Sequence, residues 1–191
     1  MIDILLVHIS DLLNQNFKNQ NGVSENKVVV SNLPDSASSS QVELENRIIC
    51  FLLSIEQETI LKNKNGRMGG SSSGMMDKFA PLYLNLQLVF CANFKSENYL
   101  EGLNYLSQTI SFFHQNRIIN LGNIQGLSMK MDKLSFELSN LSYDNLSQVW
   151  SAIGSKVLPS AIYKVGLVIF DNTPIRSITP VISATGSQNP D

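Results

Sequence analysis

Apolar residues recur every three or four positions in three segments of the chain, and each pattern predicts an amphipathic helix. The first helix is predicted from Ile2 to Phe17 and ends before Gly22. The second is expected to be capped by Ser96, and its predicted buried stripe consists of Tyr99, Leu100, Leu103, Leu106, Ile110 and Phe113. The third is capped by Ser142, ends at Gly154 and has Leu146, Val149, Trp150 and Ile153 on one face.

Between the helices, short apolar runs and alternating apolar and polar residues predict strands. These strands span residues 27–31, 46–56, 82–93, 117–121, 134–138 and 161–170. The last run is apolar on both faces except at Lys164, which is typical of a strand in the middle of a sheet. Helices and strands do not alternate regularly, so the expected class is α+β, with a mostly antiparallel sheet packed by about three helices.

The length of 191 residues and the hydrophobic content of 43% suit a single domain with a real core, expected over residues 1–171. Residues 59–76 read as a flexible connection that carries Lys62, Lys64 and Arg67 and then a run of glycines and serines. Residues 172–191 form a C-terminal tail whose end is expected to be disordered.

The charge balance and the apolar runs exclude several classes of partner. With 14 basic and 16 acidic residues, the chain has no basic field of the kind that binds nucleic acid. No apolar run reaches the roughly 18 residues that a transmembrane helix needs, so no membrane insertion is expected. The first residues lack the basic region of a signal peptide, which predicts that synthesis and assembly take place in the cytoplasm.

Cys50 and Cys91 each lie within an apolar run without metal-binding spacing, so buried, reduced thiols are expected. A disulfide between adjacent strands is the alternative that the sequence leaves open.

Residue patterns for catalysis or cofactor binding do not emerge from the sequence. His8 and His114 have no motif around them and read as residues on a helix face and at a helix end. The glycines of residues 66–74 lack the Gly-Lys-Ser/Thr ending of a phosphate-binding loop. We therefore expect no enzyme activity, no cofactor and no metal.

Several residues have both a structural and a partner-binding interpretation. Trp150 can be an interface residue, but its helical spacing with Leu146 and Ile153 favours burial in the core. Lys156 and Lys164 can pair with carboxylates of a partner, or can be a solvated turn residue and a strand residue with an extended side chain.

The chain also resembles a known family through seven segments that occur in a characteristic order. They are the N-terminal helix, Val28–Leu33, Glu45–Ile49, Pro81–Leu86, Ser107–Phe113, Asp132–Leu138 and the element from Trp150 to Val165. Together they resemble the tail-terminator or tube-cap family of contractile injection systems.

This resemblance implies a structural protein that forms a ring, typically a hexamer, at the distal end of an inner tube. Such a cap stops tube growth and links the tube to the contractile sheath, so its partners are copies of itself, the tube protein and the sheath protein. On this basis, the predicted partner contacts are Lys62, Lys64, Arg67, Trp150, Lys156, Tyr163 and Lys164. The assembled particle can be released or anchored to a membrane.

Three alternatives stay open at this point. A baseplate or tube-initiating adaptor of the same machine would bind the other end of the tube. A peptide-binding module would use an exposed strand edge. A small hydrolase would need a polar pocket around a perturbed base.

Overall fold

The computed structural model describes residues 1–33, 44–58, 75–76, 82–121, 133–170 and 178–179. Its helices are α1 (Ile2–Asn21), the 3₁₀ turn η2 (Ser96–Asn98), α3 (Tyr99–Gln115) and α4 (Tyr143–Ile153). The strands are β1 (Val28–Val30), β2 (Arg47–Gln57), β3 (Met75–Met76), β4 (Leu82–Asn93), β5 (Ile118–Asn120), β6 (Lys133–Leu138), β7 (Ser160–Phe170) and β8 (Ile178–Thr179).

The ends of the helices follow from particular residues. Gly22 and Gly154 adopt left-handed conformations with φ of 65° and 72°, as a glycine that terminates a helix does. The Ser142 side chain accepts a hydrogen bond from the Asn145 amide at 3.3 Å and caps α4, as predicted. The predicted cap at Ser96 is wrong, because Ser96 begins the 3₁₀ turn and α3 starts only at Tyr99.

Six strands form one sheet in the order β1-β2-β4-β7-β6-β5. All neighbouring pairs are antiparallel except β1 and β2, which run parallel with Val28 opposite Ile48. β7 lies between β4 and β6, so the expectation of a central strand is confirmed. β3 and β8 pair separately as a two-stranded sheet. The predicted α+β class with a mostly antiparallel sheet is confirmed.

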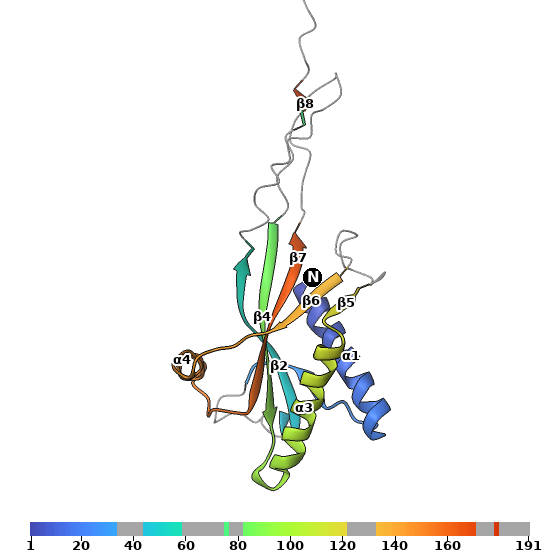
Figure 1. The fold of residues 1–191 in the computed structure, drawn as a ribbon, viewed down its shortest axis with the longest axis vertical. Helices are drawn as coiled ribbons and strands as arrows, with labels where there is room; N and C mark the ends of the chain where they lie inside the picture. Colours follow the sequence, from blue (N-terminus) through green and yellow to red (C-terminus); the bar gives the residue numbers. More distant parts are fainter. Residues whose placement is uncertain (34–43, 59–74, 77–81, 122–132, 171–177, 180–191) are drawn as a thin grey trace, which may run out of the picture.

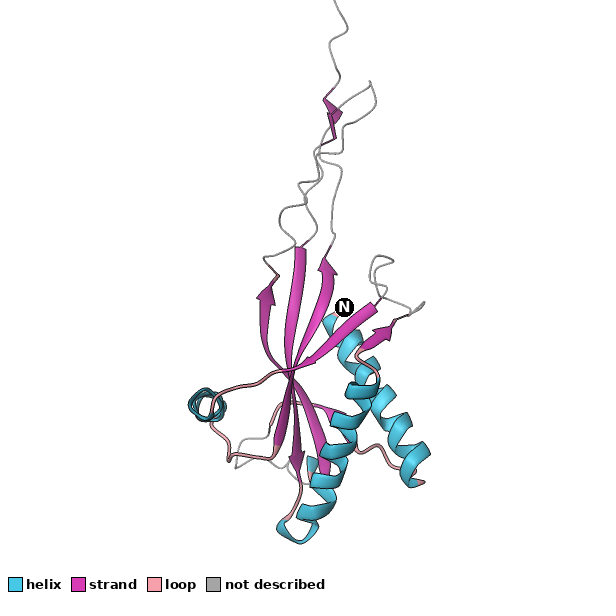
Figure 2. Cartoon of the chain, viewed as in Figure 1, coloured by secondary structure: helices cyan, strands magenta, loops and turns pink. Residues whose placement is uncertain are grey.

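Helices cover both faces of the six-stranded sheet, with α1 and α3 on one face and α4 on the other (Figures 1 and 2). Successive side chains of a strand point to opposite faces, so the apolar runs of β2 and β4 supply two cores. The first core lies under α1 and α3 and contains Phe17, Phe90 and Phe113. The second core lies under α4 and contains Ile49, Trp150 and other residues.

The buried stripe of α3 differs from the one that spacing predicts. Leu106 and Phe113 are buried, but Tyr99, Leu100 and Ile110 are exposed, Leu100 by 78%. The helix instead turns Gly102, Tyr105 and Thr109 toward the sheet together with Leu106 and Phe113. The prediction for these three exposed residues is wrong because the helix buries a small and a polar residue that an apolar count leaves out.

Both cysteines are free and buried, as predicted, and they lie on opposite faces of the sheet. Cys50 pairs with Phe90 and belongs to the first core, whereas Cys91 pairs with Ile49 and belongs to the second. This separation across the sheet accounts for the absence of a disulfide between them, although their strands are adjacent.

We expect neither thiol to react with iodoacetamide in the folded protein. Burial raises the pKa of each thiol to about 12, so at pH 8 only about one thiol in 10⁴ is the reactive thiolate. Mass spectrometry after a pulse of the reagent should find unmodified chain in buffer and two modifications in strong denaturant. Rapid modification of the folded chain at either cysteine would contradict this placement.

Candidate functional site

Helix α4 and the turn after it form the first candidate surface. Trp150 is only 2% exposed and fills the second core, with Leu146 and Ile153 packed against the same cluster. Trp150 is therefore a core residue, as its helical spacing favours. It can affect the binding of a partner only by fixing the position of α4. Lys156 and Val157 follow Gly154 and are exposed. The side of the turn that a partner can reach is thus one cation next to one apolar side chain.

Lys164 and Tyr163 are neighbours in β7 and point to opposite faces of the sheet. Lys164 is half-buried and lies opposite Gln87 of β4 and Glu137 of β6. Tyr163 is 3% exposed and belongs to the first core. The predicted contacts at Lys62, Lys64 and Arg67 lie outside the described residues, so the structure does not bring them together with this element.

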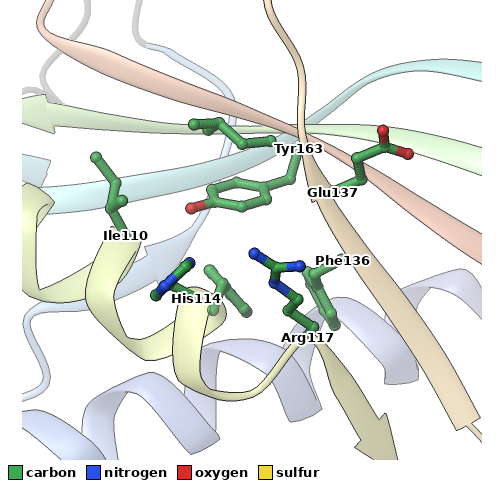
Figure 3. A pocket seen from close by; sticks show the side chains of 8 residues that line it. Ile110, His114, Arg117, Phe136, Glu137 and Tyr163 are labelled. Carbon is green, nitrogen blue, oxygen red and sulfur yellow. The ribbon is translucent and has the colours of Figure 1, made fainter.

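Tyr163 forms part of the wall of a pocket of about 240 Å³. The pocket lies where the end of α3 meets β6 and β7 (Figure 3). Its other lining residues are Ile110, Phe113, His114, Arg117, Phe136, Glu137 and Leu138. Phe113 and Phe136 stack with ring centroids 4.4 Å apart, which fixes the apolar floor.

Three polar groups point toward the same space in this pocket. Figure 3 shows the Tyr163 hydroxyl, the His114 ring and the Arg117 guanidinium converging, while the Glu137 carboxylate points away. Among the described residues, neither the Tyr163 hydroxyl nor the Arg117 guanidinium has a hydrogen-bond or ion-pair partner. Burial raises the pKa of Tyr163 to about 12, so its hydroxyl stays protonated and can donate at neutral pH.

Sequence reasoning treated His114 as a helix-end residue and did not identify Arg117 or Ile110 as site residues. The sequence shows here only an aromatic residue near the end of a helix, Phe113, followed by a histidine and an arginine, His114 and Arg117. This pattern is common in sequences. Only the structure, in which β6 lies next to the end of α3, shows that these residues line one pocket.

The outer edges of the six-stranded sheet are only partly covered by the short strands. β1 pairs with Ile48 to Cys50 of β2, and β5 pairs with Lys133 to Ser135 of β6. Within the described part of the chain, no strand pairs with the outer side of β2 beyond Phe51 or of β6 at Leu138. These edges can accept an additional strand.

The described residues give no metal centre, because no three His, Cys, Asp or Glu side chains among them come close enough to hold an ion. Their helices are also too short or too polar to cross a lipid bilayer.

A family model described as the Pvc16 N-terminal domain matches residues 6–184 of the chain. The chain belongs to the Pvc16 N-terminal domain family. This membership confirms the resemblance to the terminator family that the sequence showed. No curated protein matches the chain.

Two structures solved by cryo-electron microscopy share the fold of this Pvc16 N-terminal domain chain. One is the sheath/tube terminator of an extracellular contractile injection system, PVC, in the extended state, with a TM-score of 0.57 and 16% identity over all of this chain. The other is the tube-terminating cap of the anti-feeding prophage, with a TM-score of 0.54 and 15% identity over 96% of this chain. The chain covers 64% and 61% of these two proteins.

Proposed function

We propose that this chain is a structural cap of a contractile injection particle, placed at the end of the inner tube where it stops tube growth. The observation that carries the proposal is the family match over residues 6–184, together with a fold shared with two tube terminators over 100% and 96% of this chain. A cap needs binding surfaces and no reaction, so the proposed protein is not an enzyme and uses no cofactor.

The finer parts of the proposal concern partners and assembly. In this proposal the cap is a homo-oligomeric ring of six copies, by analogy with the family, that contacts the tube protein and links it to the sheath. A closed ring requires two different surfaces on each copy that bind each other. The partly uncovered sheet edges at β2 and β6 are at opposite sides of the sheet and are suitable for such contacts. The particle assembles in the cytoplasm and acts outside the cell that made it.

The tube-contact surface includes the turn at Lys156, together with Lys62, Lys64 and Arg67. Cations attract carboxylates of a partner and contribute chiefly to the rate and specificity of association. Trp150, Tyr163 and Lys164 support this surface by holding α4 and β7 in place.

Added to growing tubes of the cognate tube protein, the chain should arrest elongation at one end at amounts far below the amount of tube protein. Electron microscopy should show density at the distal end of each arrested tube. Lys156→Glu should weaken this arrest, while Lys18→Glu, which reverses an exposed charge at the end of α1, serves as the matched control.

Each possible result separates the proposal from its alternatives. Binding to the proximal end would indicate a tube-initiating adaptor instead of a terminator. A folded chain that stays monomeric and binds neither end of the tube at any concentration would refute the cap function and favour a peptide-binding module.

A further inference from the structure

We propose that the pocket at Tyr163 binds the free C-terminus of an extended partner polypeptide whose last residue is apolar. The apolar side chain fills the pocket, the terminal carboxylate is held by Arg117, and the segment pairs with the edge of β6. This site goes beyond the proposed cap function and does not depend on it.

The polar groups of the pocket call for an anion that accepts hydrogen bonds. Tyr163 is 3% exposed, and its hydroxyl points into the pocket without a protein partner among the described residues, so it is available to a ligand. Arg117 and His114 aim at the same space from the end of α3. A carboxylate has the acceptors for these donors, and its bonds to a guanidinium are strong.

The size and walls of the pocket restrict what carries the carboxylate. Its volume of about 240 Å³ is below the usual range of sites for cofactors and drug-sized ligands, about 300–1,000 Å³. Ile110, Phe113, Phe136 and Leu138 make most of the lining apolar. The space suits one aliphatic side chain with a carboxylate beside it.

The edge of β6 next to the pocket favours a polypeptide as the ligand. Phe136 donates its amide to the Arg117 carbonyl on the outer side of β6, at 2.8 Å, whereas Ser139 donates to Ile162 on the β7 side, at 2.8 Å. Backbone groups alternate between the two sides of a strand, so those of Leu138 point outward. No described strand pairs with them there, and Leu138 is 45% exposed. An extended segment can therefore add to this edge.

Strand geometry then selects a C-terminal residue over an internal acidic one. In an extended segment, neighbouring side chains point to opposite faces, and side chains two residues apart are separated by about 6–7 Å. An internal Asp or Glu and an apolar neighbour therefore cannot enter one small pocket together. A C-terminal residue carries its side chain and its carboxylate on the same Cα.

The test measures binding of a six-residue probe peptide of serine and threonine that ends in a leucine with a free carboxylate and bears a fluorophore at its N-terminus. Fluorescence anisotropy with the full chain should give saturable binding. The same peptide with a C-terminal amide, or with serine in place of the last leucine, should bind at least about tenfold more weakly, because a hydrogen bond to a charged group or the apolar contact is lost.

Variants of the chain locate the site. Arg117→Gln should weaken binding of the free acid by about tenfold or more and leave the weak binding of the amide unchanged. Tyr163→Phe keeps the ring in the core and should weaken binding severalfold. Lys18→Gln, which removes an exposed cation at the far end of α1, is the matched control and should have no effect. Circular dichroism verifies that each variant is folded.

Three results would overturn the site. The first is absence of binding by the folded chain up to about 1 mM peptide. The second is equal affinity for the free-acid peptide and its C-terminal amide. The third is an affinity for an amidated peptide with an internal glutamate that equals the affinity for the free-acid peptide. Because the assay contains no tube protein, its failure leaves the cap function untouched, and failure of tube capping leaves this site untouched.

Discussion

Trp150→Ala is expected to lower the free energy of unfolding by about 3–5 kcal/mol, as other truncations of large buried aromatic residues do. Trp150 is the largest fully buried side chain described in the structure, and it is the one residue of α4 that is buried in the second core. Its loss should therefore loosen α4 more than α1 or α3. Hydrogen exchange should show the greatest loss of protection in Tyr143–Ile153, and urea unfolding followed by circular dichroism gives the energy.

Trp150→Phe is the matched variant and should stay within about 1 kcal/mol of the wild type. The buried indole N–H of Trp150 has no hydrogen-bond partner among the described residues. Phenylalanine leaves a small cavity, but it removes this unsatisfied donor, and the two effects are similar in size and opposite in sign. A loss as large as that of the alanine variant would mean that the indole N–H has a partner in solution. An alanine variant of wild-type stability would refute the role of the second core.

If α4 and its turn contact the tube, this pair of variants also separates stability from function. The alanine variant should cap tubes poorly even under conditions in which the rest of the domain is folded, because Lys156 loses its fixed position. The phenylalanine variant keeps α4 on the sheet and should cap normally. Such a difference would connect the burial of one side chain to the presentation of an exposed one.

Local sequence rules predict the elements of this chain well where one residue type decides the conformation. Gly22 and Gly154 end helices because glycine adopts the left-handed conformation at little cost, and Ser142 caps α4 with its hydroxyl. The predicted strand at Leu82–Asn93 has the bounds that the structure shows. In each case the determining interaction lies within a few residues along the chain.

Prediction failed where the outcome depends on a distant contact. A Cβ at Gly102 would lie 2.7 Å from the Phe94 ring, so the absence of a side chain there lets α3 pack closely. The helix therefore turns its Gly102 face toward the core, and Leu100 is exposed. Spacing along the helix cannot reveal it. The parallel pairing of β1 with β2 likewise joins segments that lie apart in the sequence, so local sequence rules do not predict its direction.

The site was less predictable than the fold for the same reason. The pocket at Tyr163 combines the end of α3 with β6 and β7, which are brought together only by the sheet order. Arg117 has no motif around it in the sequence, and it becomes a candidate ligand-binding residue only because the Tyr163 hydroxyl points into the same space. The sequence shows which residues carry hydrogen-bond donors, but only the fold shows which of these donors point into the same pocket.

Asn14→Leu is expected to destabilise the protein by about 2–5 kcal/mol, because two buried backbone groups would lose their partners. The Asn14 amide donates to the Val28 carbonyl at 2.9 Å, and its oxygen accepts from the Val28 N–H at 2.8 Å. Leucine has a similar volume and can satisfy neither group. Urea unfolding at neutral pH measures the loss, and a loss under about 0.5 kcal/mol would show that water replaces both bonds.

Asn14→Asp gives a control that depends on pH. A carboxylate at this position still accepts from the Val28 N–H, but it faces the Val28 carbonyl without a proton to donate. Burial and this carbonyl would raise the pKa of the new carboxyl in the folded state above its unfolded value of about 3.9. The penalty relative to the wild type should then be smallest near pH 4 and should grow as the pH rises toward 7. A penalty that is independent of pH would mean that the charge reaches water.

Asn14→Leu also tests whether Asn14 keeps β1 paired with β2 at the edge of the sheet. β1 has only three residues and pairs with Ile48 to Cys50, and the two hydrogen bonds of Asn14 tie it to α1 beside the buried Val28 side chain. If β1 detaches, the buried half of β2 becomes an uncovered edge next to its already uncovered half, and such edges promote aggregation. Asn14→Leu should therefore aggregate at concentrations at which Trp150→Ala stays soluble, because the latter variant leaves β1 in place.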